Sequence, residues 1–203
     1  LIPRGGAGLI RSVVEESTVP VIQTGTGNCH IYVDDEADLD MGVKILFNAK
    51  CSRPAVCNAA EKLLVARPVA AEFLKKAMEP LRAKGVEIRG CPETCTLIPW
   101  AVPATEEDWY TEYDDLILGV KVVDGIDEAI SHINTYNPQH SEAIVTQNYT
   151  KALRFHHEID AAAVHVHPST RFTDGGAFGP GAEIRIRTQK HHTPVPLASL
   201  DIT

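Results

Sequence analysis

Apolar and polar positions along the chain follow two alternating repeats. Short runs rich in β-branched residues, such as LILGVKVV at 116–123, have the pattern of buried strands, whereas longer runs, such as VAAEFLKKAMEPLRAKG at 69–85, have apolar residues at helical spacing. Strands separated by helices of ten or more residues favour parallel pairing, so the pattern predicts an α/β fold with a largely parallel sheet and flanking helices. The remaining segments read as strands at 1–3, 19–24, 29–34, 62–66, 86–90, 142–147 and 162–167, and as helices at 8–17, 39–50, 127–136 and 149–158.

Several residues indicate where the helices begin and end. Asp38 is a good N-cap for the helix at 39–50, and Gly85 favours the end of the helix at 69–85. Pro80 lies inside that second helix and predicts a kink or an early end. Residues 91–109 are rich in Pro, Thr and acidic side chains, and they are predicted to be irregular.

The composition is that of a soluble globular protein, with 44% apolar and 23% charged residues among 203. A formal net charge of −8 argues against general binding to nucleic acids or anionic membranes. No apolar run approaches the ~20 residues that span a bilayer, and no signal peptide is visible. The chain begins at LIPRGG without Met. We therefore expect a cytoplasmic protein and a fragment of a longer chain.

The five cysteines favour reduced thiols over a disulfide-rich secreted scaffold. The pair in CPETC would need two more clustered ligands to bind zinc, and the nearest histidines, His132 and His140, lie far along the chain. His165 and His167 are two residues apart on a predicted strand and would point to the same face, but no carboxylate or cysteine clusters with them in the sequence. We predict no metal site.

Ligands of open α/β sheets bind beyond the carboxyl ends of the strands, and this rule selects three loops, at 4–8, 48–58 and 167–181. In the first loop, PRGGAG, glycines precede a helix. Glycine lets the backbone approach a ligand closely, and a helix N-terminus favours an anion. The stretch fits contact with a nucleotide phosphate, with Arg4 pairing to it, and it also fits an ordinary tight turn with a solvated Arg4.

The second loop, in NAKCSRPAVCNAAE, contains Cys51 and Cys57. Asn58 and Glu61 have the spacing of a capping box, which predicts a helix beginning directly after Cys57. The free N–H groups and the positive end of that helix, together with Arg53, would favour a Cys57 thiolate. A backbone N–H at the same turn would face the oxyanion that forms on attack. Two interpretations remain: Cys57 is a nucleophile, or both cysteines are small buried apolar residues.

The third loop, HPSTRFTDGGAFGPGAE, combines hydroxyl groups, charged groups and glycines after a strand. Its Arg would bind the carboxylate of an amino-acid-like ligand, and its Asp would bind the ammonium group. A long structural loop with a solvated ion pair is the alternative. The candidate residues are Ser169, Thr170, Arg171, Thr173 and Asp174.

At these loops the sequence resembles a known family. NAKCSRPAVCNAAEKLLV is similar to the active-site segment of the γ-glutamyl phosphate reductases (glutamate-5-semialdehyde dehydrogenases), which belong to the aldehyde dehydrogenase superfamily. IPRGGAGLI, GNCHIYVD, TEYDDLILGVKVVD, DEAISHIN, HSEAIVT and STRFTDGGAFGPGAE also match. The resemblance covers almost the whole chain and roughly the C-terminal half of such an enzyme. It implies an aldehyde dehydrogenase-like, three-layer α/β/α fold.

The resemblance also implies domain boundaries and a reaction. Residues 1–48 would complete an NADP-binding domain, 49–170 would form the catalytic domain, and 171–203 would return to the cofactor and oligomerisation region. The implied reaction is the NADPH-dependent reduction of L-γ-glutamyl 5-phosphate to L-glutamate 5-semialdehyde and phosphate, in proline biosynthesis. Cys57 matches the catalytic cysteine, which attacks the acyl phosphate and forms a thioester.

Further roles follow by position. Glu112 matches the glutamate that holds the nicotinamide ribose, and the turn at Gly5, Gly6 and Gly8 matches the segment that contacts the cofactor. The 169–174 loop matches the segment near the substrate, and we group Arg53 with it as a candidate for substrate binding. The resemblance further implies a homo-oligomer, with glutamate 5-kinase as a candidate partner or as a domain fused upstream.

The chain departs from the family at several positions. The hydrolytic glutamate of the superfamily falls near Gln23, a tolerable loss in an enzyme that releases an aldehyde. Other departures are Pro138, His167-Pro168, Arg185 and Arg187. The two arginines stand where the family has glycine and serine, and they are expected to alter subunit contacts or weaken activity. Another aldehyde dehydrogenase, or a silent homologue acting in assembly, is the alternative. Because most of the cofactor domain would lie upstream, the fragment alone is predicted to be inactive.

Overall fold

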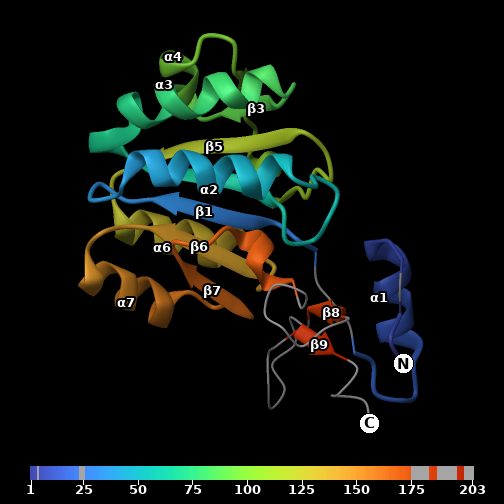
Figure 1. Ribbon diagram of the computed structural model, residues 1–203. Helices are drawn as coiled ribbons and strands as arrows, with labels where there is room; N and C mark the ends of the chain where they lie inside the picture. The colour runs from blue at the N-terminus through green and yellow to red at the C-terminus, as the bar shows by residue number, and fades with distance from the viewer. Residues whose placement is uncertain (4, 23–25, 175–182, 187–195, 199–203) are drawn as a thin grey trace.

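The centre of the molecule is a parallel sheet. The computed structural model describes residues 1–3, 5–22, 26–174, 183–186 and 196–198. Seven strands lie in the order β4-β3-β5-β2-β1-β6-β7, and each neighbouring pair is parallel (Figure 1). A separate two-stranded sheet pairs β8 and β9 antiparallel. The predicted α/β class with a largely parallel sheet is confirmed.

The elements have the following bounds. The strands are β1 (Cys29–Val33), β2 (Ala60–Ala66), β3 (Glu87–Gly90), β4 (Val102–Pro103), β5 (Ile117–Val123), β6 (Ser141–Val145), β7 (Ala163–Val166), β8 (Glu183–Ile186) and β9 (Pro196–Ala198). The helices are α1 (Ala7–Glu16), α2 (Leu39–Cys51), α3 (Arg67–Ala83), α4 (Pro92–Leu97), α5 (Glu106–Tyr110), α6 (Ile126–Tyr136) and α7 (Tyr149–Glu158), with a 3₁₀ turn η1 (Thr170–Thr173).

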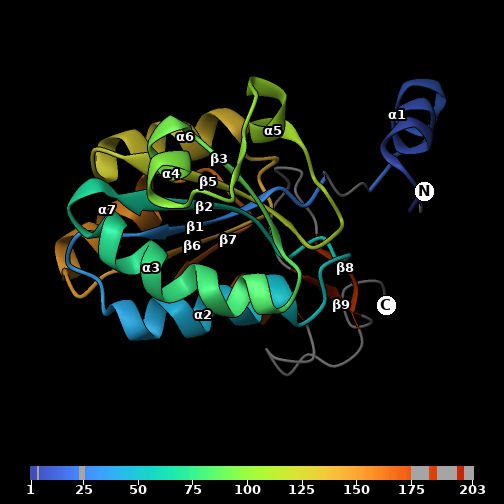
Figure 2. The ribbon, with the colours of Figure 1, turned by 90° about the horizontal axis from the view of Figure 1, so that it is seen from above.

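Successive side chains of a strand point to opposite faces of the sheet. Both faces of the main sheet are buried because helices cover each of them. Ile31 and Val33 of β1 belong to the core that α2 and α3 cover, whereas Tyr32 between them packs with Phe155 in the core under α6 and α7. Figure 2 shows α2 and α3 on one face of the sheet and α6 on the other. The result is the predicted arrangement of three layers.

The N-terminal segment lies apart from this sheet. Both views show α1 beside the sheet rather than on one of its faces (Figures 1 and 2). The strands predicted at 1–3 and over 19–22 are absent from the described chain. The two stretches nevertheless meet as parallel strands do, because the Leu1 carbonyl accepts from the Ile22 N–H at 2.8 Å and the Leu1 amino group donates to the Pro20 carbonyl at 2.7 Å.

The prediction of an irregular segment at 91–109 is wrong, since α4, β4 and α5 lie there. A capping box begins α5: the Asp108 carboxylate accepts from the Thr105 N–H at 2.7 Å and from its hydroxyl at 2.9 Å. Pro80 does not end α3, which continues to Ala83.

The predicted helix after Cys57 is also wrong. Residues 53–59 form turns, and β2 begins at Ala60. Neither residue of the expected capping box is available to cap a helix, because Asn58 bonds to Arg171 and Glu61 pairs with Lys50. The apolar run that follows is fully buried and continues as the strand.

The ends of the strands correct a further expectation. The 48–58 loop leads from α2 into β2 and therefore lies at the amino edge of the parallel sheet, not beyond the carboxyl ends. The 167–174 segment follows β7, but Thr173 reaches Ser141 at the start of β6, where their hydroxyl oxygens are 2.9 Å apart. Among the described residues, the helices are too short or too polar for any of them to cross a membrane.

Candidate active site

Four strands that are neighbours in the sheet bring the candidate residues together. In the order β5-β2-β1-β6, each strand is preceded by a segment with polar or reactive groups. Glu112 precedes β5, Cys57 precedes β2, Gly27 precedes β1, and His140 precedes β6. Because parallel strands share their amino edge, these segments converge on one side of the molecule.

The turn that carries Cys57 is packed tightly against Gly27. Cys57 is exposed, and Gly27 is buried beneath its main chain. A Cβ added to Gly27 would lie 1.9 Å from the Cys57 carbonyl oxygen and 2.4 Å from its Cα. The thiol of Cys29 also lies 3.2 Å from the same carbonyl oxygen and donates to it. The main chain of Cys57 is therefore fixed from below, while its side chain faces outward.

Glu112 reaches the same glycine. Its half-buried carboxylate lies near the Gly27 N–H, which stabilises the charged form of the group. Burial raises the pKa of this carboxyl, and the Gly27 N–H and the charge of Lys62 offset part of the rise. Glu112 and Cys57, far apart in the sequence, thus meet at Gly27.

Lys62 lies buried behind this group. Its stem crosses Gly119, where an added Cβ would come within 2.7 Å of the lysine Cδ. The ammonium group donates to the Thr111 carbonyl at 2.7 Å and lies 4.4 Å from the centre of the Tyr113 ring. Burial lowers the pKa of Lys62 to about 7, and the nearby Glu61 opposes this effect. An amine that is only partly protonated at neutral pH therefore underlies the backbone next to Glu112.

The third loop joins the site through Arg171. Its guanidinium donates to the Asn58 side-chain oxygen, directly beside Cys57. The Asp174 carboxylate lies 3.8 Å from the same guanidinium. Arg171 keeps 19% of its side chain exposed, so its position is compatible with contact to a ligand at Cys57.

The other candidates of this loop are buried. Ser169 accepts from the Arg171 N–H at 3.3 Å and so caps η1. Thr173 is bonded to Ser141 and His165, and the Thr170 hydroxyl is buried without a hydrogen-bond partner among the described residues. Ser169 and Thr173 hold the loop in shape, and Arg171 and Asp174 are the half-buried members of the set.

Two further candidates lie in the same stretch as Cys57. Arg53 is exposed in the turn, four residues before the cysteine. Cys51 ends α2 and packs against the larger core. Burial raises the pKa of the Cys51 thiol, which favours its protonated form.

The candidate glycines for cofactor binding lie at the start of α1, with Gly6 as the N-cap residue. A Cβ added at Gly6 or Gly8 would meet nothing within 4 Å, whereas one at Gly5 would collide with Leu9. The Leu9 side chain is exposed and can move away, so packing within the described chain does not require a glycine at any of the three positions.

Some of the departures from the family can be located and others cannot. Pro138 is half-buried in the connection before β6. His167 lies outside β7 with φ of 75°, so it does not share a strand face with His165 as expected. Positive φ is the region where Asn is favoured over most side chains. Arg4, Gln23, the stretch at 175–182 and Arg187 lie outside the described residues, as does the side chain of Arg185.

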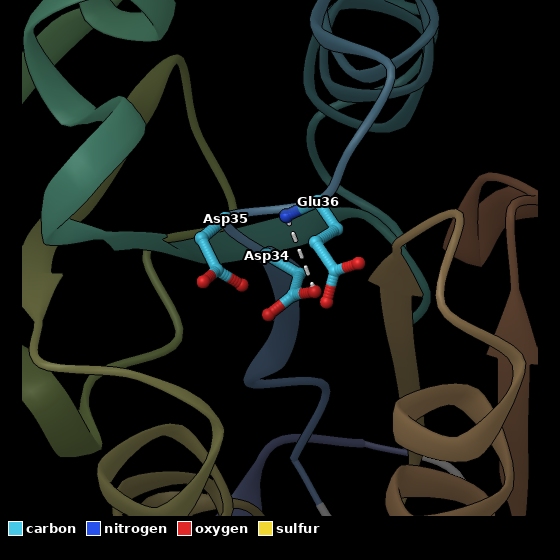
Figure 3. Close-up of side chains that lie close together, drawn as sticks. All are labelled: Asp34, Asp35 and Glu36. Carbon is cyan, nitrogen blue, oxygen red and sulfur yellow. Dashed lines mark hydrogen bonds between the residues drawn. The ribbon is translucent and has the colours of Figure 1, made fainter.

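An acidic cluster follows β1 at the opposite edge of the sheet. Asp34, Asp35 and Glu36 have carboxylate oxygens within 4.8 Å of one another (Figure 3). Lys151 of α7 ion-pairs with all three, and its ammonium lies 3.1 Å from the Asp34 and Glu36 carboxylates. This ammonium supplies the positive charge that the cluster requires, so we assign no ligand to it.

Sequence reasoning missed most of the groups that support the site. Gly27 stands just before the strand predicted at 29–34, and a glycine in that position is a signal of close backbone approach. Cys29 and Lys62 were read as ordinary members of apolar strands. A lysine inside a buried strand was the visible signal for Lys62, because unpaired lysines are almost never fully buried.

The comparisons with known proteins concern the chain as a whole. No family model matches the chain. The γ-glutamyl phosphate reductase of Clostridium perfringens is 63% identical over 203 residues, which are all of this chain and 49% of that protein. The enzyme of the same name from Halothermothrix orenii is 61% identical over the same shares.

Solved structures with the same fold match this chain. The γ-glutamyl phosphate reductase of Thermotoga maritima matches with a TM-score of 0.96 and 57% identity, over 99% of this chain and 49% of that one. A propionaldehyde dehydrogenase of Rhodopseudomonas palustris, at 13% identity and a TM-score of 0.72 over 96% of this chain and 53% of that one, shares the fold alone. The chain spans about half the length of the curated relatives that it matches, and along that span it belongs to the γ-glutamyl phosphate reductase family.

Proposed function

We propose that the whole protein carrying this chain reduces L-γ-glutamyl 5-phosphate to L-glutamate 5-semialdehyde, with Cys57 as the nucleophile. The name of the relatives at about 60% identity supports the substrate. The observation that carries the proposal is the convergence at Gly27, which packs against the Cys57 main chain and whose N–H stabilises the charged Glu112 carboxylate. An exposed thiol with a rigid main chain suits covalent catalysis.

Cys57 needs no helix dipole in this proposal. Its thiolate attacks the carbonyl carbon of the acyl phosphate, the bond to the phosphate oxygen breaks, and a thioester forms with release of phosphate. NADPH, when bound, supplies the hydride that reduces the thioester. The C–S bond then breaks, which frees the aldehyde and restores the thiolate. No water attack is required, and this agrees with Gln23 in place of a hydrolytic glutamate.

The described residues fit a nicotinamide cofactor in two respects. Glu112 presents a half-buried carboxylate close to Cys57, as a group that holds ribose hydroxyls requires. Gly6 and Gly8 leave open space at the beginning of α1, where a phosphate would meet free N–H groups. An engineered glycolyl-CoA reductase with the same fold has been solved with NADP⁺ bound. We therefore propose Gly5, Gly6, Gly8 and Glu112 as the cofactor-binding residues of this chain.

The assignment of residues to the parts of the substrate rests on charge. In this proposal, Arg171 and Arg53 bind the substrate carboxylate or its phosphate, and Asp174 binds the ammonium group. Ser169, Thr170 and Thr173 act by shaping the loop. Assembly into a homo-oligomer and association with a glutamate 5-kinase remain predictions from the family resemblance.

The test uses the whole protein with γ-glutamyl phosphate and NADPH. Cys57→Ser is expected to abolish NADPH consumption, and Cys51→Ser, the matched control, is expected to retain it. Without NADPH, the wild-type protein should gain the mass of a glutamyl group on the peptide that contains Cys57. Reduction by Cys57→Ser at the wild-type rate would remove Cys57 from the mechanism.

A further inference from the structure

A second cysteine, Cys29, lies directly beneath the proposed nucleophile. It is the first residue of β1, its side chain is fully buried, and its sulfur lies 3.2 Å from the carbonyl oxygen of Cys57. Burial raises the pKa of the Cys29 thiol well above its ordinary value, so the group keeps its hydrogen at neutral pH. Only the protonated thiol can donate to a carbonyl oxygen.

Cys29 also begins a buried polar chain. His140 Nδ1 lies 3.7 Å from the Cys29 sulfur and 2.9 Å from the Ser141 hydroxyl oxygen. The Ser141 hydroxyl in turn donates to the Thr173 hydroxyl oxygen at 2.9 Å. Thr173 belongs to η1, in the loop of the substrate candidates. The chain therefore runs from the main chain of Cys57 to the 169–174 loop.

The hydrogen positions along this chain are mutually consistent. Ser141 has one hydroxyl hydrogen, which it gives to Thr173, so His140 Nδ1 carries the hydrogen shared with Ser141. The same N–H also faces the Cys29 sulfur at 3.7 Å, which acts there as a weak acceptor because its own hydrogen is given to the Cys57 carbonyl. Thr173 donates to the Thr170 carbonyl at 3.0 Å and accepts from His165 Nε2 at 2.8 Å. Each hydroxyl thus has a single donor role, which makes one arrangement of this network preferred over others.

The same two segments are joined a second time at the surface. The Arg171 guanidinium donates to the Asn58 side chain, one residue after Cys57. Hence the Cys57 turn and the 169–174 loop are linked above by Arg171 and below by the chain from Cys29. Two separate links therefore join these segments, and the lower one is buried.

We propose that Cys29 is a positioning residue, whose thiol holds the Cys57 carbonyl and couples the nucleophile turn to the substrate loop through His140, Ser141 and Thr173. This inference rests on the proposed function of Cys57. Its role is to fix the direction from which the nucleophile meets the substrate carbonyl, and it takes no part in bond making. Misplacement of a reacting group by about 1 Å costs on the order of a hundredfold in rate.

The test compares Cys29→Ala, Cys29→Ser and the control Cys51→Ala in the whole protein. Cys29→Ala is expected to lower kcat at least about tenfold without raising the KM for NADPH. Cys29→Ser keeps a donor at the same position and should recover kcat to within about threefold of wild type. Cys51→Ala should stay near wild type. A kcat of Cys29→Ala within twofold of wild type, or an equal loss in Cys29→Ser, overturns the inference.

A double-mutant cycle separates coupling from packing. Ser141→Ala breaks the chain in its middle, and it serves alone if Cys29→Ala does not fold. Ser141→Ala should lower kcat about threefold or more. The fold loss of kcat in the double variant should be smaller than the product of the fold losses in the two single variants. Strictly multiplicative effects contradict the coupling. If Cys57→Ser loses turnover while Cys29→Ala keeps the wild-type kcat, the positioning role alone is refuted. If Cys57→Ser retains turnover, the proposed function is refuted.

Discussion

At the scale of single residues, the candidate site depends on the absence of a side chain at Gly27. This residue has no chemistry of its own, yet its N–H stabilises the charged Glu112 carboxylate and its Cα surface accommodates the main chain of Cys57. The contact with Cys57 needs the two backbones to approach more closely than a Cβ permits. The glycine therefore sets the distance between the proposed nucleophile and the proposed cofactor carboxylate.

The first prediction is that Gly27→Ala removes activity. The added Cβ would lie 1.9 Å from a backbone oxygen, which cannot rotate away as a flexible side chain can, so the Cys57 turn must move. We expect turnover to fall on the order of a hundredfold and stability by ~1–3 kcal/mol, measured by NADPH consumption and by urea unfolding.

Gly125 provides the control for this substitution. It precedes α6, its φ of 168° is extended, and an added Cβ meets nothing within 4 Å. Gly125→Ala should therefore preserve both turnover and the unfolding midpoint. Wild-type turnover in Gly27→Ala would show that the Cys57 main chain need not be held where the structure has it.

At the scale of elements, a buried ion pair joins α2 to β2. Lys50, in the last turn of α2, lies 3.2 Å from Glu61 of β2, and their side chains are 0% and 1% exposed. Burial raises the pKa of Glu61 to about 7 against the opposing charges of Lys50 and Lys62, and burial lowers the pKa of Lys50. The pair spans the loop that contains Cys57, so it fixes both ends of that loop.

The second prediction concerns this pair. Lys50→Met leaves Glu61 buried without its partner, and we expect a loss of ~3–5 kcal/mol in the free energy of unfolding. Adding Glu61→Gln should recover much of the loss, because Gln keeps an oxygen for the Tyr113 N–H, which now lies 3.3 Å from the Glu61 carboxylate. The measurement is the midpoint of urea unfolding.

Lys76→Met is the matched control, since Lys76 pairs with Asp40 and Glu72 on an exposed helix surface, with 41% of its side chain accessible. Its midpoint should stay close to wild type, because exposed pairs contribute little. A Lys50→Met midpoint equal to that of Lys76→Met would contradict a structural role for the buried pair.

The elements also show what the sequence could predict. Apolar periodicity was sufficient for the strands and helices of the main sheet, because their buried faces repeat regularly, as in α7 with its predicted bounds of 149–158. It failed where local spacing had a long-range use. Asn58 and Glu61 have capping spacing but bind Arg171 and Lys50, residues that only the folded chain brings near.

The site was predictable to a similar extent. The family resemblance directed attention to Cys57, Glu112 and the 169–174 loop, and the structure brings these into one region. The helix-dipole argument for Cys57 was wrong, and the physical support comes instead from Gly27 and Cys29 of a neighbouring strand. Pairing between strands cannot be read from the spacing of residues in one segment, so this support was not visible in the sequence.

At the scale of the whole molecule, the described chain leaves an apolar surface near its N-terminal helix. Leu1, Leu9 and Val19 are 61%, 54% and 52% exposed, and α1 lies apart from the sheet (Figures 1 and 2). Exposed apolar groups that gather in one segment are typical of surfaces that other protein segments cover. The proposed glycines for cofactor binding lie on this same segment, away from the sheet that carries Cys57.

The third prediction follows from this separation. Hydride transfer requires the cofactor and the thioester to be fixed relative to each other, and within the part of the chain that the structure describes only the sheet side of that geometry is built. We expect the chain alone to fold its parallel sheet but to show no NADPH-dependent reduction of γ-glutamyl phosphate.

Acylation of Cys57 depends on the sheet and the 169–174 loop, so it should persist in the chain. Circular dichroism, NADPH consumption and peptide mass, each compared with the whole protein, distinguish these steps. Turnover by the chain at a rate near that of the whole protein would show that the described residues suffice to hold the cofactor, whereas loss of acylation as well would show that the Cys57 turn itself depends on the rest of the protein.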